Sequence, residues 1–210
     1  MQSLFYTTES TNQYKVFYTA DLNGGGMLFG PEYPSIIRKF YPNRIFNTCM
    51  EWCSGPGFIG YNILDHGLCN NLVLNDIYQP AIDIANNTAE YNNLSKRVST
   101  YCAGDIGTLP DTLKVDLVVA NPPHYDRSFN NRIADDLNWE IHRNFYTKIG
   151  NYLTDDGAII IQENADGSDV SMFEEMINDN NLKILDVLKS PQYFTEAPML
   201  IYYIHITKRI

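Results

Sequence analysis

The sequence predicts an α/β fold in which a largely parallel sheet is covered by helices on both faces. Three observations carry this prediction. From residue 45 onward, short apolar runs alternate with segments of helical periodicity. The apolar runs are nearly continuous, which is typical of parallel strands buried on both sides. A glycine-rich stretch follows the first run, as in strand–loop–helix units that bind ligands.

The core strands are expected where the apolar runs occur. In chain order these are residues 45–52, 71–76, 98–103, 115–120, 157–162, 183–188 and 199–207. Helices are expected between them at residues 58–65, 78–91, 133–153 and 171–180. The longest of these helices is predicted from Leu137, Ile141, Phe145 and Ile149, which recur every four residues.

The last two strands follow one another without a helix between them. Only a loop at residues 190–198 separates them, so they are expected to form an antiparallel hairpin at an edge of the sheet. Most other consecutive core strands are separated by an expected helix, as in a parallel sheet with crossover connections. Between the strands at 98–103 and 115–120, a short stretch at 108–114 replaces the helix.

The N-terminal stretch is rich in aromatic residues and ends at Gly24-Gly25-Gly26. Buried aromatic side chains are common, so a strand pair or arm packed on the core is one interpretation. A lid over a ligand, hinged at the three glycines, is the other. The aromatic residues are Phe5, Tyr6, Tyr14, Phe17 and Tyr18.

The amino-acid composition excludes some classes of function. The chain has 210 residues, 44% of them hydrophobic, which is enough for one globular domain. Lys plus Arg total 15 and Asp plus Glu total 25, so the net charge is −10. This balance argues against general affinity for nucleic acid or anionic membranes. No apolar run approaches the roughly 20 residues of a membrane span, and no signal peptide is visible, which favours a cytoplasmic protein.

Four cysteines give no indication of a metal site. Cys49, Cys53, Cys69 and Cys102 lack the close CxxC pairing of zinc sites. They are expected to be small buried residues of a reducing compartment, and no metal is predicted.

The first chemical motif is Gly55-Pro56-Gly57-Phe58-Ile59-Gly60, which matches GxGxxG between a strand and a helix. Glycines there allow a tight turn and bring backbone N–H groups close to a ligand. Asp76 ends the next strand, and its carboxylate can accept hydrogen bonds from both hydroxyls of a ribose. The pair therefore indicates a nucleoside-containing cofactor, and NAD fits it as well as any other.

The second motif narrows the choice of cofactor and reaction. Gly104-Asp105 and Asn121-Pro122-Pro123-His124-Tyr125 follow the third and fourth strands, at the sheet edge where α/β proteins bind ligands. The prolines remove two N–H donors and stiffen the backbone. The segment therefore presents several rigidly held hydrogen-bond acceptors, which suit an NH2 group, and the rings of His124 and Tyr125 are beside them.

Together these segments resemble class I S-adenosylmethionine-dependent methyltransferases with an Asn-Pro-Pro-aromatic motif, over about residues 29–210. These enzymes methylate amino groups of adenine or cytosine, or glutamine amides. The resemblance implies a Rossmann-like sheet of seven strands, in the order 3-2-1-4-5-7-6 with strand 7 antiparallel. It also implies S-adenosyl-L-methionine as cofactor and S-adenosyl-L-homocysteine as product.

The resemblance also implies roles for particular residues. Asn121 and Pro122 are the expected catalytic residues, because the Asn121 side-chain oxygen and the Pro122 carbonyl can accept the two N–H bonds of the acceptor. Asn121 is expected next to the cofactor too. The other expected cofactor-binding residues are Glu51, Cys53, Gly55, Gly57, Asp76, Ile77, Asp105 and Ile106. The expected substrate-binding residues are His124, Tyr125, Arg127, Phe29 and Pro31.

Two departures from the family pattern bear on the substrate. His124 stands where Tyr, Phe or Trp is usual, and only about 45 residues precede the first core strand. Residues 1–44 are expected to form an arm or cap over the cofactor and substrate site, and residues 45–210 the methyltransferase domain. The expected acceptor is a protein glutamine amide, with an RNA or DNA base amine or a small molecule still open. Arg127 and Arg132 offer a local grip for an RNA or nucleotide.

Two other functions fit part of the sequence. An NAD-dependent oxidoreductase would explain the glycine loop and Asp76, but Asn-Pro-Pro offers no proton donor to a carbonyl substrate. A non-catalytic, cofactor-binding partner subunit would keep the fold without the reaction. Intact Gly57, Asp76 and Asn121 argue against that possibility.

Overall fold

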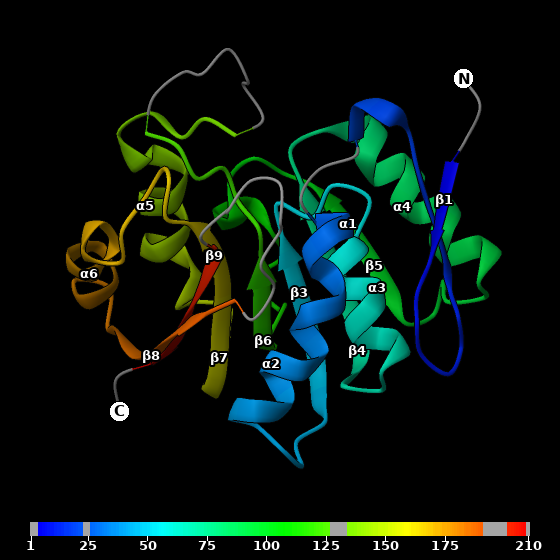
Figure 1. The fold of residues 1–210 in the computed structure, drawn as a ribbon, viewed down its shortest axis with the longest axis horizontal. Coiled ribbons are helices and arrows are strands. Elements are labelled where there is room, and N and C mark those ends of the chain that lie inside the picture. The colour runs from blue at the N-terminus through cyan, green and yellow to red at the C-terminus, as the bar shows by residue number, and fades with distance from the viewer. Residues whose placement is uncertain (1–3, 23–25, 127–133, 191–200, 209–210) are drawn as a thin grey trace. The chain divides into compact units, whose positions relative to one another are not determined.

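The computed structural model describes residues 4–22, 26–126, 134–190 and 201–208 (Figure 1). Its contacts divide the chain into two compact units. The first holds Met1–Gly104 and Val115–Ala120, and the second holds Asp105–Lys114 and Asn121–Ile210. Among the described helices, none is long and apolar enough to cross a membrane.

The main sheet has seven strands in the order β5-β4-β3-β6-β7-β9-β8. Numbered within the sheet, this order is 3-2-1-4-5-7-6, and the last strand, β9, runs antiparallel to both of its neighbours. The predicted fold class is therefore confirmed. The strands are β3 Phe46–Trp52, β4 Cys69–Asp76, β5 Val98–Cys102, β6 Val115–Ala120, β7 Leu153–Asn164, β8 Leu182–Lys189 and β9 Ile201–Lys208.

In the first unit, β3 pairs in parallel with β4 and β6, and β4 pairs in parallel with β5. Helix α3 (Phe58–Asp65) packs on β3 and β4, and α4 (Gln79–Tyr91) packs on β4 and β5. Every residue of α3 is buried, which explains why its pattern is apolar all round.

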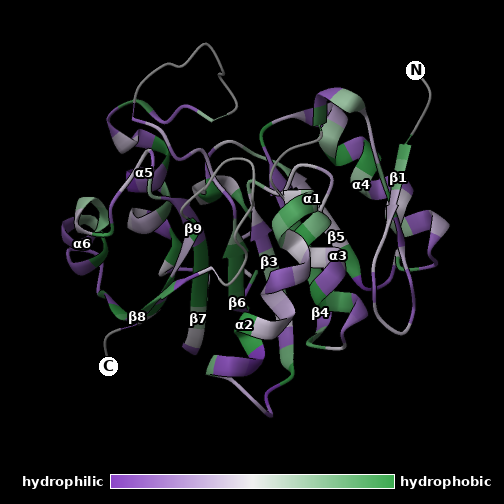
Figure 2. Ribbon diagram, in the orientation of Figure 1, coloured by the Kyte–Doolittle hydropathy of each residue, from purple (hydrophilic) through white to green (hydrophobic). Residues whose placement is uncertain are grey.

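In the second unit, β9 pairs with β7 and β8, and α6 (Ser171–Asn178) packs on β8 and on α5 (Glu140–Ile149). Much of β6 and β7 is hydrophobic in Figure 2, in keeping with strands buried on both faces. In β7, residues 157–164 are all buried. No α-helix lies between β5 and β6, where the described chain forms only a short 3-10 turn, η3 (Ile106–Thr108).

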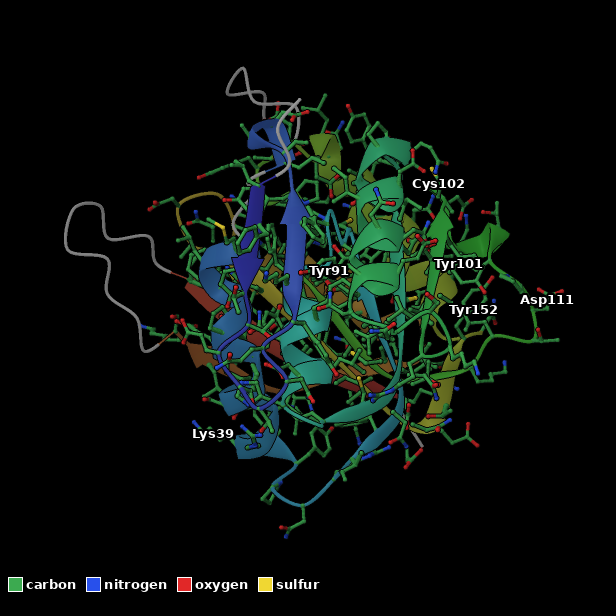
Figure 3. The ribbon with its side chains drawn as sticks, turned by 90° about the vertical axis from the view of Figure 1, so that its right-hand side faces the viewer. Lys39, Tyr91, Tyr101, Cys102, Asp111 and Tyr152 are labelled. Carbon is green, nitrogen blue, oxygen red and sulfur yellow. The ribbon has the colours of Figure 1, made fainter. Side chains whose placement is uncertain are left out.

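The aromatic N-terminal stretch forms an antiparallel pair of strands, β1 (Leu4–Thr7) and β2 (Lys15–Tyr18). The Phe17 N–H donates to Thr88 Oγ1 at 3.0 Å, and the Phe17 ring meets the Tyr91 ring edge-on. Figure 3 shows this pair lying along α4. The packed-strand interpretation is therefore confirmed; Gly24 and Gly25 of the expected hinge lie outside the described residues.

A 3-10 turn, η1 (Ala20–Leu22), follows β2, and three further short helical segments of the described chain precede β3. They are α1 (Gly26–Phe29), η2 (Gly30–Glu32) and α2 (Tyr33–Phe40). Tyr33 is fully buried, and its hydroxyl donates to the Ala120 carbonyl at 2.5 Å, at the end of β6. This bond fixes the start of α2 to the strand that leads into Asn121.

The predicted helix at residues 133–153 is wrong at both ends. The α-helix covers only Glu140–Ile149, because Asn138 and Trp139 have positive φ angles of 55°. A 3-10 turn, η4 (Leu137–Trp139), precedes it, and β7 already begins at Leu153. Two residues of the predicted apolar stripe, Leu137 and Ile141, are exposed. The buried face is formed instead by His142, Phe145, Tyr146 and Ile149.

Two further expectations need correction. The strand predicted at residues 157–162 is the middle of the longer β7. The cysteines are not uniformly buried: Cys49 and Cys69 are, Cys53 is half-buried and Cys102 is exposed at the end of β5. None of the four forms a disulfide.

Candidate functional site

The glycine loop between β3 and α3 depends on two positive φ angles. Gly55 has a φ of +50° and Gly57 a φ of +91°, in the left-handed region that favours glycine. A Cβ on Gly57 would lie 2.8 Å from Leu74 Cδ1 and 3.0 Å from the Tyr61 ring, whereas one on Gly55 would meet nothing within 4 Å. Gly57 therefore serves close packing, and Gly55 leaves open space beside the loop backbone.

Glu51 lies near the end of β3 and joins this strand to α3. Its carboxylate accepts the N–H groups of Ile59 at 3.3 Å and Gly60 at 2.7 Å, in the first turn of the helix. Burial raises the pKa of Glu51 to about 8, although the two N–H bonds act in the opposite direction. The carboxyl group is thus tied to the helix rather than open to solvent.

Asp76, at the end of β4, links that strand end to the glycine loop. Oδ2 accepts the Gly55 N–H at 2.7 Å, and Oδ1 accepts the Tyr78 N–H at 2.9 Å. A carboxylate has about four acceptor positions, so half-exposed Asp76 retains capacity for further hydrogen bonds. Ile77, beside it, is 76% exposed, and its side chain covers Gly104.

This end of the first unit fits a nucleoside. It offers a carboxylate with acceptor capacity for ribose hydroxyls, an exposed aliphatic side chain for a base, and open space beside Gly55. These features are compatible with an adenosine moiety as found in several cofactors.

Asp105, which follows β5 in sequence, has partners within the second unit. Its carboxylate accepts the Gly107 N–H at 2.7 Å and bonds to Lys148 Nζ of α5 at 2.5 Å. These bonds, with that to Lys148 first, hold the pKa of Asp105 below its usual value. Ile106 is buried, so the exposed group at this position is the Asp105 carboxylate itself.

The Asn-Pro-Pro segment follows β6 and is partly accessible. Asn121 is half-buried, and its side chain has no hydrogen-bond partner among the residues that the structure describes. The buried Pro122 directs its carbonyl toward His124 Nδ1, 3.3 Å away. A backbone carbonyl has two lone pairs, so this long contact leaves one acceptor position on Pro122.

His124 and Tyr125 form an aromatic pair behind the two prolines, with ring centroids 4.5 Å apart. Burial lowers the pKa of His124, so the imidazole is neutral near pH 7. A neutral planar ring can stack on an amide or a base. The Tyr125 hydroxyl accepts a hydrogen bond from Asn164 Nδ2 at 3.3 Å.

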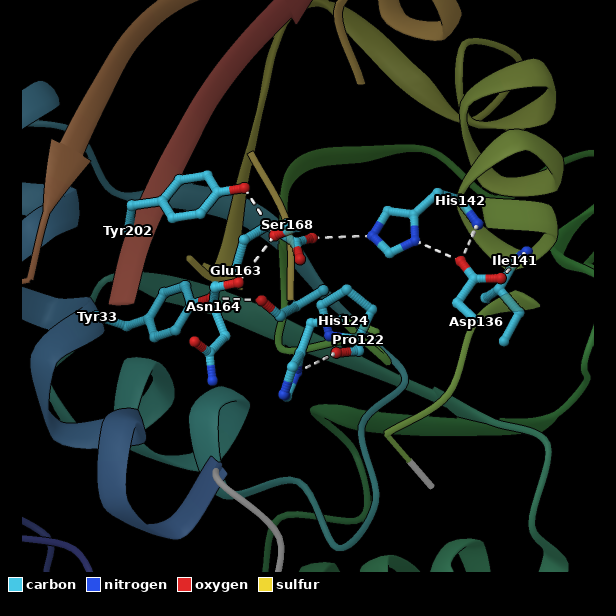
Figure 4. A network of polar contacts seen from close by, with 11 residues as sticks. Tyr33, Pro122, His124, Asp136, Ile141, His142, Glu163, Asn164, Ser168 and Tyr202 are labelled. Carbon is cyan, nitrogen blue, oxygen red and sulfur yellow. Dashed lines mark hydrogen bonds and ion pairs between the residues drawn. The ribbon is translucent and has the colours of Figure 1, made fainter. Parts of the chain in front are cut away.

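Close to this pair lies a fully buried cluster of charged residues (Figure 4). His142 bonds through Nδ1 to Asp136 at 2.6 Å and through Nε2 to Glu163 at 2.8 Å. Burial alone would lower the pKa of His142, but the two carboxylates raise it to about 9. His142 is therefore an imidazolium near pH 7 and donates from both nitrogens.

Comparison with known proteins decides the class. Residues 35–184 match the family described as the methyltransferase small domain, which is more than half of the chain. The chain belongs to this methyltransferase family. S-adenosylmethionine is accordingly its cofactor, and the nucleoside-compatible features of the first unit agree with that cofactor. A search of curated proteins gave no match.

Several solved structures are similar in fold to this methyltransferase. A candidate RNA methyltransferase from Pyrococcus horikoshii has a TM-score of 0.62 at 16% identity, over 86% of this chain and 83% of that one. An S-adenosylmethionine-dependent methyltransferase from Clostridium acetobutylicum reaches 0.64 at 14% identity, over 88% and 92%. A ribosomal protein L11 methylase from Lactobacillus delbrueckii subsp. bulgaricus reaches 0.59 at 16% identity, over 88% and 78%. At these identities the likeness concerns the fold.

The predicted site residues of the methyltransferase differ in how accessible they are in the structure. Gly55, Asp76 and Ile77 present free space, acceptor capacity or exposed surface. Glu51, Gly57 and Ile106 are engaged in packing or hydrogen bonds of the fold. Phe29 is buried, and Pro31 and Cys53 are half-buried. Arg127 and Arg132 lie outside the described residues.

Sequence reasoning missed the cluster Asp136, His142 and Glu163. Signals for it were present. His142 stands among residues with helical apolar spacing, and Glu163 directly follows the apolar run of a buried strand. Asp136 precedes the helix, where a carboxylate can accept N–H groups of its first turn. The pairing itself depends on how α5 meets β7, which the pattern does not specify.

Proposed function

We propose that this methyltransferase transfers a methyl group to the nitrogen of a planar NH2 group. The observation that carries the proposal is the Asn121 side chain, which is accessible and without a hydrogen-bond partner in the described part of the chain. It is followed by two residues that have no N–H donor and so leave carbonyl acceptors.

Acceptors in this arrangement favour an amino group. The Asn121 side-chain oxygen and the Pro122 carbonyl each accept one N–H, which holds the nitrogen and keeps its lone pair out of conjugation. When bound, S-adenosylmethionine supplies a methyl group that is already activated by its sulfonium. The two acceptors stabilise the positive charge that develops on the nitrogen, since they are in place beforehand. Holding the nitrogen in a reactive position can contribute about 7–11 kcal/mol.

The proposed binding residues follow the same logic. Asp76 is proposed to bind the ribose and Ile77 to pack on the base. Gly55 lets the loop backbone approach the cofactor, while Glu51, Cys53 and Gly57 shape that loop. Asp105, Ile106 and Asn121 are further proposed cofactor contacts, and residues 1–44 a proposed cap. His124 and Tyr125, with Phe29, Pro31 and Arg127, are proposed substrate-binding residues.

A protein glutamine amide is the favoured acceptor. The net charge of −10 disfavours extended contacts to nucleic acid phosphates. RNA is the second candidate, because two fold neighbours are described as RNA and tRNA methyltransferases. The choice of an exocyclic base amine follows from the acceptors at Asn121 and Pro122. The family match favours S-adenosylmethionine over NAD, so a dehydrogenase is no longer a competing function.

The test is a transfer assay with tritiated S-adenosylmethionine and two acceptors, a glutamine-containing peptide and an oligoribonucleotide that contains adenosine and cytidine. Hydrolysis and mass spectrometry of the product then locate the methyl group. The proposal expects N-methylglutamine, or an N-methylated base amine if the acceptor is RNA. A methyl group on oxygen, on carbon or on a ring nitrogen contradicts it. Tight binding of S-adenosylhomocysteine without transfer to any acceptor would support a non-catalytic partner subunit.

A further inference from the structure

The buried cluster Asp136–His142–Glu163 is unusual because burying its charged groups costs much free energy. All three side chains have no exposed surface, and two of them are carboxylates. Removing charges from water is expensive, and apolar residues of similar volume often replace buried ion pairs without loss of stability. A contribution to stability alone is thus a poor explanation for the cluster.

The Asp136 end of the cluster holds the backbone of the aromatic pair. The Asp136 N–H donates to the Tyr125 carbonyl at 2.7 Å, and the Ala134 carbonyl accepts the N–H groups of His124 and Tyr125 at 3.1 and 3.0 Å. Tyr125 and Asp135 form a short parallel bridge in this way. The Asp136 carboxylate also accepts the N–H groups of Ile141 and His142. Residues 134–136 are therefore anchored on α5 on one side and on the aromatic pair on the other.

The Glu163 end of the cluster reaches the ring of the same tyrosine. Asn164, the next residue, donates from Nδ2 to the Tyr125 hydroxyl at 3.3 Å. The Asn164 carbonyl accepts the N–H groups of Gly167 and Ser168, which forms a tight turn. A Cβ on Gly167 would lie 2.3 Å from Tyr125 Cδ1 and 2.4 Å from the His124 carbonyl, so this turn lies directly against the aromatic pair.

His142 thus joins two segments that hold Tyr125 from different sides. One segment binds its backbone and the other contacts its ring and hydroxyl. Because the two carboxylates bond to opposite nitrogens of one imidazole, the spacing between the segments is set by a rigid ring. The Pro122 carbonyl oxygen lies 3.3 Å from Nδ1 of His124, which is one member of this aromatic pair.

We infer that Asp136, His142 and Glu163 are positioning residues that orient the His124–Tyr125 pair for the methyl acceptor. The inference rests on the proposed function, since it assigns these residues to the acceptor side of the same site. It predicts that weakening the cluster impairs acceptor use while leaving cofactor binding intact.

The experiment compares His142→Gln with Glu163→Gln and with the core control Ile177→Val. His142→Gln cannot donate to both carboxylates, whereas Glu163→Gln keeps an acceptor for Nε2. With the glutamine-containing peptide as acceptor, His142→Gln is expected to lower kcat/KM by about 10–100-fold, mainly through KM. Its Kd for S-adenosylhomocysteine should stay within about twofold of the wild-type value. Glu163→Gln should lose less kcat/KM than His142→Gln, because it keeps that acceptor, and only Ile177→Val should keep kcat/KM within about threefold.

A second readout does not need turnover. Hydrogen exchange at the Tyr125 and Asp136 amides should become at least about tenfold faster in His142→Gln and stay unchanged in Ile177→Val. Unchanged KM with unchanged exchange at these amides overturns the inference, as does a parallel loss of kcat and cofactor binding with KM constant. If the wild-type protein methylates no NH2 group, the proposed function fails and the assignment to the acceptor fails with it; the exchange result then decides only whether the cluster orders the Tyr125 and Asp136 segments.

A milder variant covers the case in which His142→Gln does not fold. Asn164→Ala removes the bond to the Tyr125 hydroxyl, together with the one that Asn164 Oδ1 accepts from the Asp166 N–H, and leaves the charged cluster in place. It should raise KM for the peptide about threefold or more without changing the Kd for S-adenosylhomocysteine. An unchanged KM in folded Asn164→Ala contradicts the inference.

Discussion

The surroundings of the glycine loop in the first unit and of the His124–Tyr125 pair in the second both contain carboxyl side chains, but these are held by different partners. The carboxylates of Glu51 and Asp76 are bound by backbone N–H groups. Those of Asp136 and Glu163 both bond to one histidine side chain, and Asp136 also accepts the N–H groups of Ile141 and His142. Backbone donors come with the secondary structure, whereas a side-chain partner comes only with correct packing. The second region should therefore be the more sensitive to substitution.

The largest difference is expected between His142→Leu and Glu51→Gln. Leucine leaves two buried carboxylates without their cation, which should lower the free energy of unfolding by about 3–5 kcal/mol. Glutamine at position 51 keeps an acceptor for an N–H of α3 and should cost about 1 kcal/mol. Urea denaturation of both variants measures the difference. Equal losses would mean that the two regions are stabilised in the same way.

Within the glycine loop, the two positive-φ glycines should differ. Gly57→Ala combines an unfavourable φ with contacts to Leu74 and Tyr61, and should cost about 2–4 kcal/mol. Gly55→Ala meets open space and should cost about 1–2 kcal/mol from φ alone. Thermal unfolding checks the order. A larger loss at Gly55 would show that space beside that loop is already filled.

Stability should depend on pH through one buried group in each region. The pKa of His142 is raised from 6.5 to about 9, so its stabilising effect is complete below pH 6.5 and is lost as the pH rises toward 9. Burial raises the pKa of Glu51 from 4.5 to about 8, so stability also falls as the pH rises through that range. Between pH 7 and 9 the free energy of unfolding should drop by about 1–3 kcal/mol.

Variants separate the two contributions to this slope. Denaturant titrations at several pH values measure how steeply the free energy of unfolding falls as the pH rises. This pH dependence should be weaker than in the wild type for both variants, and the reduction should be larger for His142→Gln than for Glu51→Gln. A wild-type stability that rises from pH 7 to 9 contradicts the proposed charge states of both groups.

The smallest effect is expected for the partly exposed pair Lys148–Asp105. Its side chains are 32% and 42% exposed, so solvent screens the interaction. Lys148→Ala should leave Tm unchanged within error and raise the pKa of Asp105 toward its usual value. A loss of Tm comparable to that of Gly55→Ala would give this pair a structural importance that its exposure does not suggest.

The same contrast explains what could be predicted from the sequence. Continuous apolar runs and glycines gave β6 and α3 their observed bounds, because both elements follow from local pattern. Leu137 and Ile141 misled the prediction, since positive φ at Asn138 and Trp139 starts a new helix at Glu140. The side-chain cluster around His142 requires knowledge of which elements meet, and apolar periodicity carries no such information.

Asn121→Ala tests the central claim, that an unpartnered asparagine side chain accepts an N–H of the substrate amine, most directly. Calorimetry with S-adenosylhomocysteine and turnover of the wild-type acceptor are measured on the same preparation. The Kd should stay within about threefold while kcat falls by about 100–1,000-fold, the range for loss of a transition-state hydrogen bond. Turnover equal to that of the wild type would contradict the claim.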